Sequence, residues 1–189
     1  MGSRTPSRAW LGACGVIGIA LGCSSGKAES VTSEEVMSEI DERSTVGGTL
    51  RTLGERHDVA VEISVGNEGS RTGRITLIVS ADGKVEVVQL RSGRAREFST
   101  RWSVEQLHEF GSALAEAGFC SVAERDGERE PDDVRVLLKA VTGSELLCEK
   151  NVWHGDRYVD AGLDKIIKRF DAIVSVVTSG ELPHGKRLQ

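Results

Sequence analysis

The chain has 189 residues, of which 39% are hydrophobic, 28% charged and only 4% aromatic. This length suits one domain, or one domain with a tail. The net charge of −5 argues against a dedicated nucleic-acid binder. The mean hydropathy of −0.21, without an apolar run long enough to span a bilayer, excludes a polytopic membrane protein.

The N-terminal segment has the pattern of an export signal. Arg4 and Arg8 precede an uncharged apolar stretch of 14 residues, Ala9 to Gly22. Such a stretch is too short for about 30 Å of hydrocarbon, which needs about 20 helical residues. A positive start, a short apolar centre and a polar continuation indicate a signal peptide over residues 1–22. A buried helix of a cytosolic domain is the alternative.

The signal ends in a sequence with a small residue before a cysteine, Gly22 before Cys23. Residues 19–26 resemble the lipobox of bacterial lipoproteins, although Ala20 stands where Leu is usual. The resemblance implies that the Cys23 thiol receives a diacylglyceryl group, because a thiolate is a strong nucleophile. It also implies cleavage before Cys23 and acylation of the new amine. Cleavage at Cys14 would leave too short an apolar run.

The same resemblance implies a location. We expect a lipid-anchored protein outside the cytosol. Ser24 follows the cysteine, and by the sorting habit of enteric lipoproteins a residue other than Asp there implies the outer membrane, with the domain facing the periplasm or the cell surface.

Two cysteines remain for the folded part. Cys14 leaves with the signal and Cys23 carries lipid, so Cys120 and Cys148 form an even pair in an oxidising compartment. This favours a disulfide, with two buried free thiols as the alternative. Two cysteines with scattered histidines do not make a zinc site, so we expect no metal and no cofactor.

Residues 23–57 are polar and acidic and predict a flexible tether after the lipidated cysteine. A short helix over 33–43 is an alternative within it. We expect folded material from Asp58, a single domain over 58–180, and a disordered tail over 181–189.

The folded part starts with an antiparallel meander. Apolar and polar residues alternate over three segments, which indicates half-buried strands: 59–65, 75–79 and 85–89. Asp82-Gly83 and Ser92-Gly93 are turn sequences. A fourth, polar strand is expected over 94–100.

Two helices and a second hairpin follow. Ser103 and Gln106 have capping-box spacing before a helix predicted over 104–117. Residues 119–122 are a short strand or an exit turn, and strands follow at 134–140 and 145–150, with Leu146 and Cys148 on one face. A second helix is expected over 161–178. The order predicts an α+β fold: an antiparallel sheet meander with two packed amphipathic helices.

From the capping box onward, the order of elements resembles the small bacterial metalloprotease inhibitors called emfourins. The order is helix, Phe119-Cys120-Ser121-Val122, a loop with Pro131-Asp132, hairpin, loop and helix. The resemblance covers about half the chain and implies a protease as a partner. It assigns no inhibitory residue.

Catalytic motifs are not found. His108-Glu109 begins like a zinc-protease helix, but the second His is missing. No motif places a nucleophile, a phosphate loop or a dinucleotide loop. We therefore expect no catalytic residues and no enzyme activity.

The candidate binding residues are Trp153, His154 and Asp156, in a loop expected over 151–158 before the second helix. Core packing of Trp153 is an equal alternative. Four arginines around the Ser92-Gly93 turn form a second feature, which either meets phosphate-bearing lipid headgroups or is an exposed hairpin face: Arg91, Arg94, Arg96 and Arg101.

Together these patterns predict a lipid-anchored, non-enzymatic binding domain of the cell envelope. Its expected partners are the membrane, through the anchor, and an envelope protein or a protease, but no nucleic acid. The sequence does not indicate an oligomeric state. The alternative is a small extracytoplasmic hydrolase that uses His154, Asp156 or His108.

Overall fold

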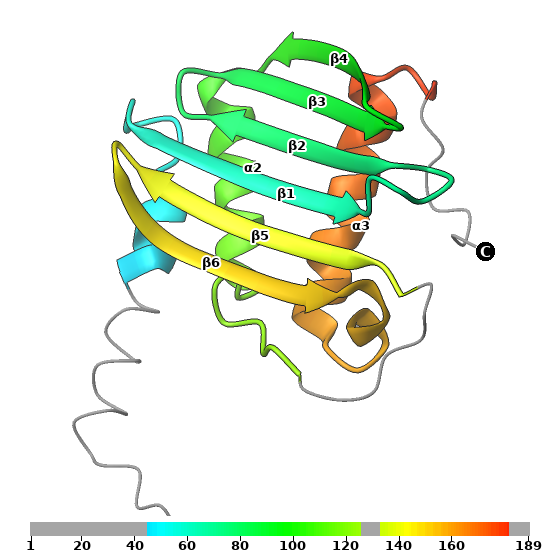
Figure 1. Ribbon diagram of the computed structural model, residues 1–189. Coiled ribbons are helices and arrows are strands. Elements are labelled where there is room, and N and C mark those ends of the chain that lie inside the picture. The colour runs from blue at the N-terminus through cyan, green and yellow to red at the C-terminus, as the bar shows by residue number, and fades with distance from the viewer. Residues whose placement is uncertain (1–44, 126–132, 182–189) are drawn as a thin grey trace, which may run out of the picture. The chain divides into compact units, whose positions relative to one another are not determined.

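The computed structural model describes residues 45–125 and 133–181 (Figure 1). The expected signal peptide, the Cys23 lipidation site, the helix over 33–43 and most of the tail lie outside the described residues. The described chain is one α+β domain with an open six-stranded antiparallel sheet and three α-helical segments. The predicted fold class is therefore confirmed.

The sheet is built from two parts of the chain. Its strands are β1 (Val59–Gly66), β2 (Arg74–Ser80), β3 (Lys84–Arg91), β4 (Arg94–Arg101), β5 (Arg135–Thr142) and β6 (Glu145–Trp153). The order across the sheet is β4-β3-β2-β1-β5-β6, and every neighbouring pair is antiparallel. The first four strands form the expected meander. The β5–β6 hairpin then adds to the free side of β1, which becomes a central strand.

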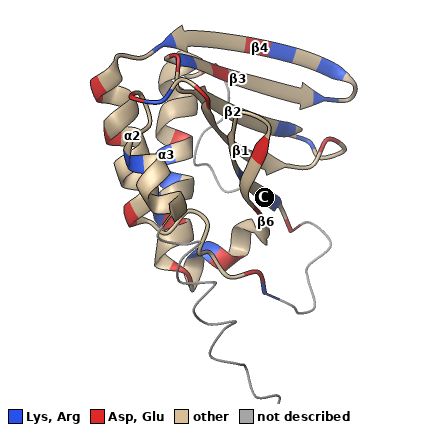
Figure 2. Ribbon diagram, turned by 90° about the vertical axis from the view of Figure 1, so that its left-hand side faces the viewer, with Lys and Arg blue, Asp and Glu red and all other residues tan. Residues whose placement is uncertain are grey.

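Two long helices cover one face of the sheet, as Figure 2 shows. They are α2 (Val104–Glu116) and α3 (Ala161–Val177). The capping box is present: the Ser103 hydroxyl accepts from the Gln106 N–H at 3.4 Å, and the Ser103 N–H donates to Gln106 Oε1 at 2.9 Å. Asp160 caps α3 by accepting from the Leu163 N–H at 2.9 Å. Among the described residues, no helix is long and apolar enough to cross a membrane.

The core lies between this sheet face and the helices. Along each strand, every second side chain points toward the helices. There it packs against the apolar side chains on the facing sides of α2 and α3. The largest fully buried side chains include Ile63, Leu77 and Leu138 from the sheet and Leu107, Phe110, Leu114, Leu163, Ile166 and Ile167 from the helices.

The folded part begins earlier than Asp58. Residues 45–51 are helical, and Val46, Leu50 and Leu53 are 6%, 1% and 0% exposed within the core. The Leu50 carbonyl lies against Gly111 of α2, where a Cβ would collide with it. The expectation of a flexible tether as far as residue 57 is therefore wrong for this segment, because its apolar side chains pack under α2.

The expected disulfide is present. Cys120 and Cys148 are bonded, with their Cα atoms 5.9 Å apart. The bond joins the turn after α2 to β6. Residues 119–121 form a turn rather than a strand; Phe119 within this turn and Val122 directly after it are both buried. The Asn151 N–H also donates to Glu124 Oε1 at 3.0 Å, so this segment is fastened to β6 at two points.

Candidate functional site

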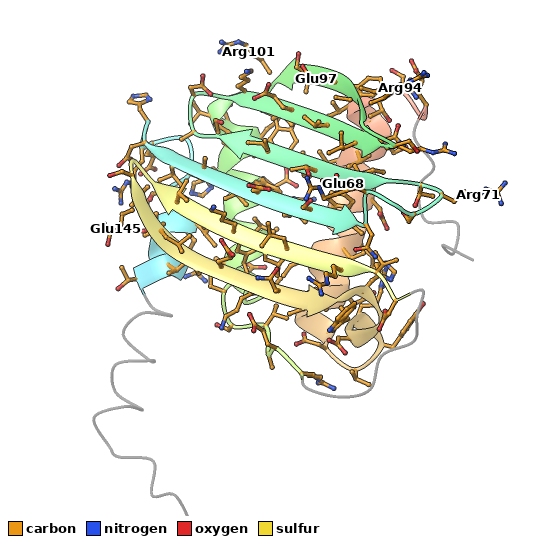
Figure 3. All side chains as sticks on the ribbon, viewed as in Figure 1. Glu68, Arg71, Arg94, Glu97, Arg101 and Glu145 are labelled. Carbon is orange, nitrogen blue, oxygen red and sulfur yellow. A yellow bond between two sulfur atoms is a disulfide. The ribbon has the colours of Figure 1, made fainter. Side chains whose placement is uncertain are left out.

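The second face of the sheet carries no described helix or strand (Figure 2; Figure 3 looks onto it). One cross-strand row runs over all six strands through residues paired in register: Glu97, Val88, Thr76, Ser64, Leu137 and Asn151. The four central residues of this row are neutral or apolar: Ser64 is buried, and Val88, Thr76 and Leu137 are half-buried. Its centre is also fastened by a 2.8 Å hydrogen bond between the Ser64 and Thr76 hydroxyls. We call this surface the uncovered face.

Trp153 lies at one corner of the uncovered face. It is the last residue of β6, so the expectation that it belongs to a loop is wrong. It pairs in register with Arg135 of β5. Arg135 precedes Leu137 by two residues in β5, so both side chains lie on the uncovered face. The Arg135 guanidinium carbon lies 5.3 Å from the Trp153 ring centroid, within the range of a cation–π contact. Trp153 is half-buried here and does not belong to the buried core cluster.

The 3₁₀ helix η1 (His154–Tyr158) holds this corner in place. Asp156 is only 6% exposed, and its Oδ2 accepts from the Trp153 N–H at 3.4 Å. Arg157, with a 14% exposed side chain, donates to Asp164 of α3 through Nε at 2.9 Å and Nη2 at 2.7 Å. These contacts tie the end of β6 to α3.

His154 is part of the same network. Its Nε2 lies 3.3 Å from Nη1 of Arg157, and its backbone N–H donates to the Val134 carbonyl at 2.7 Å. Burial lowers the pKa of His154, the Arg157 charge lowers it further, and Asp133 opposes both. Since a guanidinium can only donate, Nε2 accepts and the ring proton is on Nδ1. The neutral ring is thus the form this site favours.

The alternative hydrolase residues do not share one site. His108 lies on α2 beside a hollow of about 600 Å³, which is lined by Val104, Glu105, His108, Glu109, Ser112, Ala113, Glu116 and Arg169. No residue of η1 lines this hollow. His154 and Asp156 are close in sequence, but the contacts above direct their side chains to Arg157 and to the Trp153 N–H. The hydrolase interpretation stays a prediction.

The described residues also contain no group of three or more His, Cys, Asp or Glu side chains able to hold a metal. Sequence reasoning selected Trp153, His154 and Asp156 but missed Arg135, Arg157 and Asp164. Arg135 could have been found from the strand alternation, which places it on the face opposite to Val136. The pairing of Arg157 with Asp164 has no signal in the sequence, since it depends on how η1 meets α3.

No protein family matches the sequence, and no curated protein is detectably similar to it.

Proposed function

We propose that this chain is a bacterial lipoprotein, anchored through Cys23, whose domain is a non-enzymatic binding module for another protein of the cell envelope. The binding surface in this proposal is the uncovered face around Trp153 and Arg135. The observation that carries it is the Trp153–Arg135 contact at 5.3 Å, on a sheet face that no described element covers.

The chemistry of this pair suits protein recognition. Trp and Arg are enriched among the residues that dominate binding energy at interfaces. The pair stands beside half-buried apolar side chains such as Leu137 and is bordered by polar ones such as Asn151. Apolar and polar side chains thus stand next to each other around the pair, and the Lys139–Glu149 ion pair lies on the same face, a mixed composition that non-obligate interfaces share.

The corner is also held in a fixed conformation. The buried Asp156 carboxylate accepts from the Trp153 N–H, and the Arg157–Asp164 pair joins η1 to α3. A side chain on a fixed backbone loses less conformational entropy on binding, so more of the contact energy remains as affinity. The emfourin resemblance makes a protease one class of partner within this proposal.

Site-specific cross-linking in cells tests the binding surface. A photoreactive amino acid at Leu137 or Asn151 is expected to give discrete adducts, and one at Lys165, exposed on α3, is the matched control. Trp153→Ala in the same chain should weaken the adducts, with its melting temperature checked against wild type. Equal adducts from all three positions, or none from the uncovered face, would contradict the proposal.

Metabolic labelling tests the anchor independently. Cells given an alkyne fatty acid should label the wild-type chain, and Cys23→Ala should abolish the label. Cys14→Ala is the control and should retain it. Labelling that survives Cys23→Ala would overturn the anchor and leave the binding experiment unaffected.

A further inference from the structure

Strand β4 is an exposed edge on the opposite side of the sheet from β6. It has 8 residues, all exposed except the half-buried Phe98. It pairs with β3 without a register shift and contains no Pro or Gly. A regular edge of this length offers a row of backbone donors and acceptors to another strand.

The β3–β4 turn fixes which backbone groups point outward. Ser92 and Gly93 have φ of +50° and +72°, as a two-residue type I′ turn requires. In such a hairpin, the residues flanking the turn, Arg91 and Arg94, exchange both hydrogen bonds, and every second pair along the ladder does the same. At the far end, the Trp102 N–H donates to the Gly83 carbonyl at 2.9 Å, which is the bond expected if every second pair from Arg91 and Arg94 onward is hydrogen-bonded.

This phase leaves the odd-numbered residues of β4 facing away from β3. Their N–H and C=O groups point to the outer edge, where no described strand lies: Ala95, Glu97, Ser99 and Arg101.

The edge is also basic within an acidic chain. Residues 91–101 hold four arginines and one acid, Glu97, whereas the chain carries a net charge of −5. Figure 2 shows the Lys and Arg positions along β4 in blue, and Figure 3 labels the side chains of Arg94, Glu97 and Arg101 on this strand. Arg96 has a partner, Glu181 at 2.6 Å, and lies over Phe98 with 5.2 Å to the ring centroid.

We propose that β4 is a strand-addition edge that takes an extended acidic strand of a partner protein. In this mode, main-chain hydrogen bonds to the outward groups of β4 give affinity, and acidic side chains opposite the arginines give specificity. Because this edge is far along the sheet order from the Trp153 corner, the inference goes beyond the proposed function and does not rest on it.

Two other occupants fit less well. A second copy pairing through β4 would bring two arginine-rich strands together, which like-charge repulsion opposes. A bilayer would meet one side of the sheet only, whereas alternation sends Arg94 and Arg96 to one side and Arg101 to the other.

A peptide designed on the register of β4 provides the probe. In antiparallel pairing, the peptide Glu-Thr-Thr-Val-Thr-Glu-Val-Glu places acidic residues opposite Arg101, Arg96 and Arg94 and valine opposite Phe98. The full-length chain in neutral detergent should bind it in fluorescence polarisation, more weakly as salt rises. The amide hydrogens of Ala95, Glu97, Ser99 and Arg101 should gain exchange protection. The same peptide with Lys for Glu is the control and should not bind.

Two pairs of variants separate backbone pairing from charge. Ser99→Pro removes one outward N–H and keeps the ladder to β3, and Ser99→Ala keeps that N–H. The proline should weaken binding by about tenfold or more, and the alanine should leave it unchanged. Arg94→Glu with Arg101→Glu should also weaken binding, whereas Arg51→Glu with Lys165→Glu, at exposed positions elsewhere, should have little effect. Melting temperatures confirm that each variant is folded.

Three results would overturn the proposal. Binding that tolerates Ser99→Pro in a folded variant would mean charge attraction without strand pairing. Binding to vesicles of phosphatidylglycerol and phosphatidylcholine, but not to the peptide, would assign the edge to a membrane. A concentration-dependent dimer in sedimentation, lost with Ser99→Pro, would assign it to a second copy.

Discussion

At the scale of single residues, His154 shows how the corner of the sheet sets a protonation state. Its Nε2 is 3.3 Å from a guanidinium nitrogen of Arg157, and that guanidinium is itself held by Asp164. Protonating the ring would place two cations in contact within a half-buried site. The network that fixes Trp153 is therefore coupled to the charge of His154, and low pH is expected to loosen it.

This coupling gives a prediction about stability. The folded pKa of His154 lies below the unfolded value of about 6.5. Between those two pKa values the unfolded chain holds a proton on His154 more often than the folded chain does. The free energy of unfolding therefore falls as the pH decreases through this window, and above the window the stabilising contribution of the neutral ring is fully present. His154→Asn, which cannot protonate, should lose less stability between about pH 8 and pH 5 than wild type. Urea denaturation at both pH values measures the difference.

Asp133 faces the same ring and opposes the shift, so it provides the control. Asp133→Asn should lower the pKa of His154 further in an NMR titration of the ring. If wild type and His154→Asn lose the same stability on acidification, the coupling is absent.

At the scale of elements, local signals predicted most of the fold. The capping box at Ser103 and the alternation of strands 59–65 and 75–79 each fixed an element within a few residues, because these signals depend on neighbours in sequence. The β5–β6 hairpin was less predictable. A bulge between Ala140 and Val141 puts Leu146 opposite Val141 and Cys148 opposite Ala140, on different faces, so the expectation that they share a face was wrong.

The segment 45–51 was missed for an energetic reason. The polar, acidic composition of 23–57 predicts a tether, and Gly47 and Gly48 each disfavour a helix by about 1 kcal/mol relative to Ala, so helix propensity gives no opposing signal. Burial of Val46 and Leu50 beneath α2 overrides this preference. Trp153 was likewise expected in a loop, because the strand was expected to end at Lys150. Strand β6 in fact continues three residues further, since its pairing with β5 extends to Trp153.

The contact between 45–51 and α2 can be tested with two glycines. A Cβ at Gly111 would collide with the Leu50 carbonyl, so Gly111→Ala should destabilise the domain by about 1–3 kcal/mol. A Cβ at Gly48 would meet no atom within 4 Å, so Gly48→Ala should instead stabilise the domain by about 0.5–1 kcal/mol through helix propensity. Chemical denaturation of both variants measures the two effects. A stabilising Gly111→Ala would show that the segment does not pack there.

At the scale of the whole domain, the two edges of the sheet differ. The β6 edge is fastened to the segment after α2 by the disulfide and by the Asn151–Glu124 hydrogen bond. Neither edge has a further described strand beside it, and within the described residues the β4 edge has no disulfide of this kind. This asymmetry leaves β4 as the edge available for strand addition, and it makes the integrity of the β6 edge depend on the redox state of the compartment.

The disulfide therefore connects stability with location. Cys120 and Cys148 are 28 residues apart, and closing such a loop stabilises a fold by about 3–4 kcal/mol in the chain-entropy model. Dithiothreitol should lower the free energy of unfolding by about this amount, and Cys120→Ala with Cys148→Ala should be similarly destabilised and insensitive to the reductant. Thiol alkylation in intact cells, followed by mass spectrometry, tests the location: both cysteines should be protected until reduced, as in an exported protein. Alkylation of both without reduction would place the domain in a reducing compartment and would count against the lipid-anchored proposal.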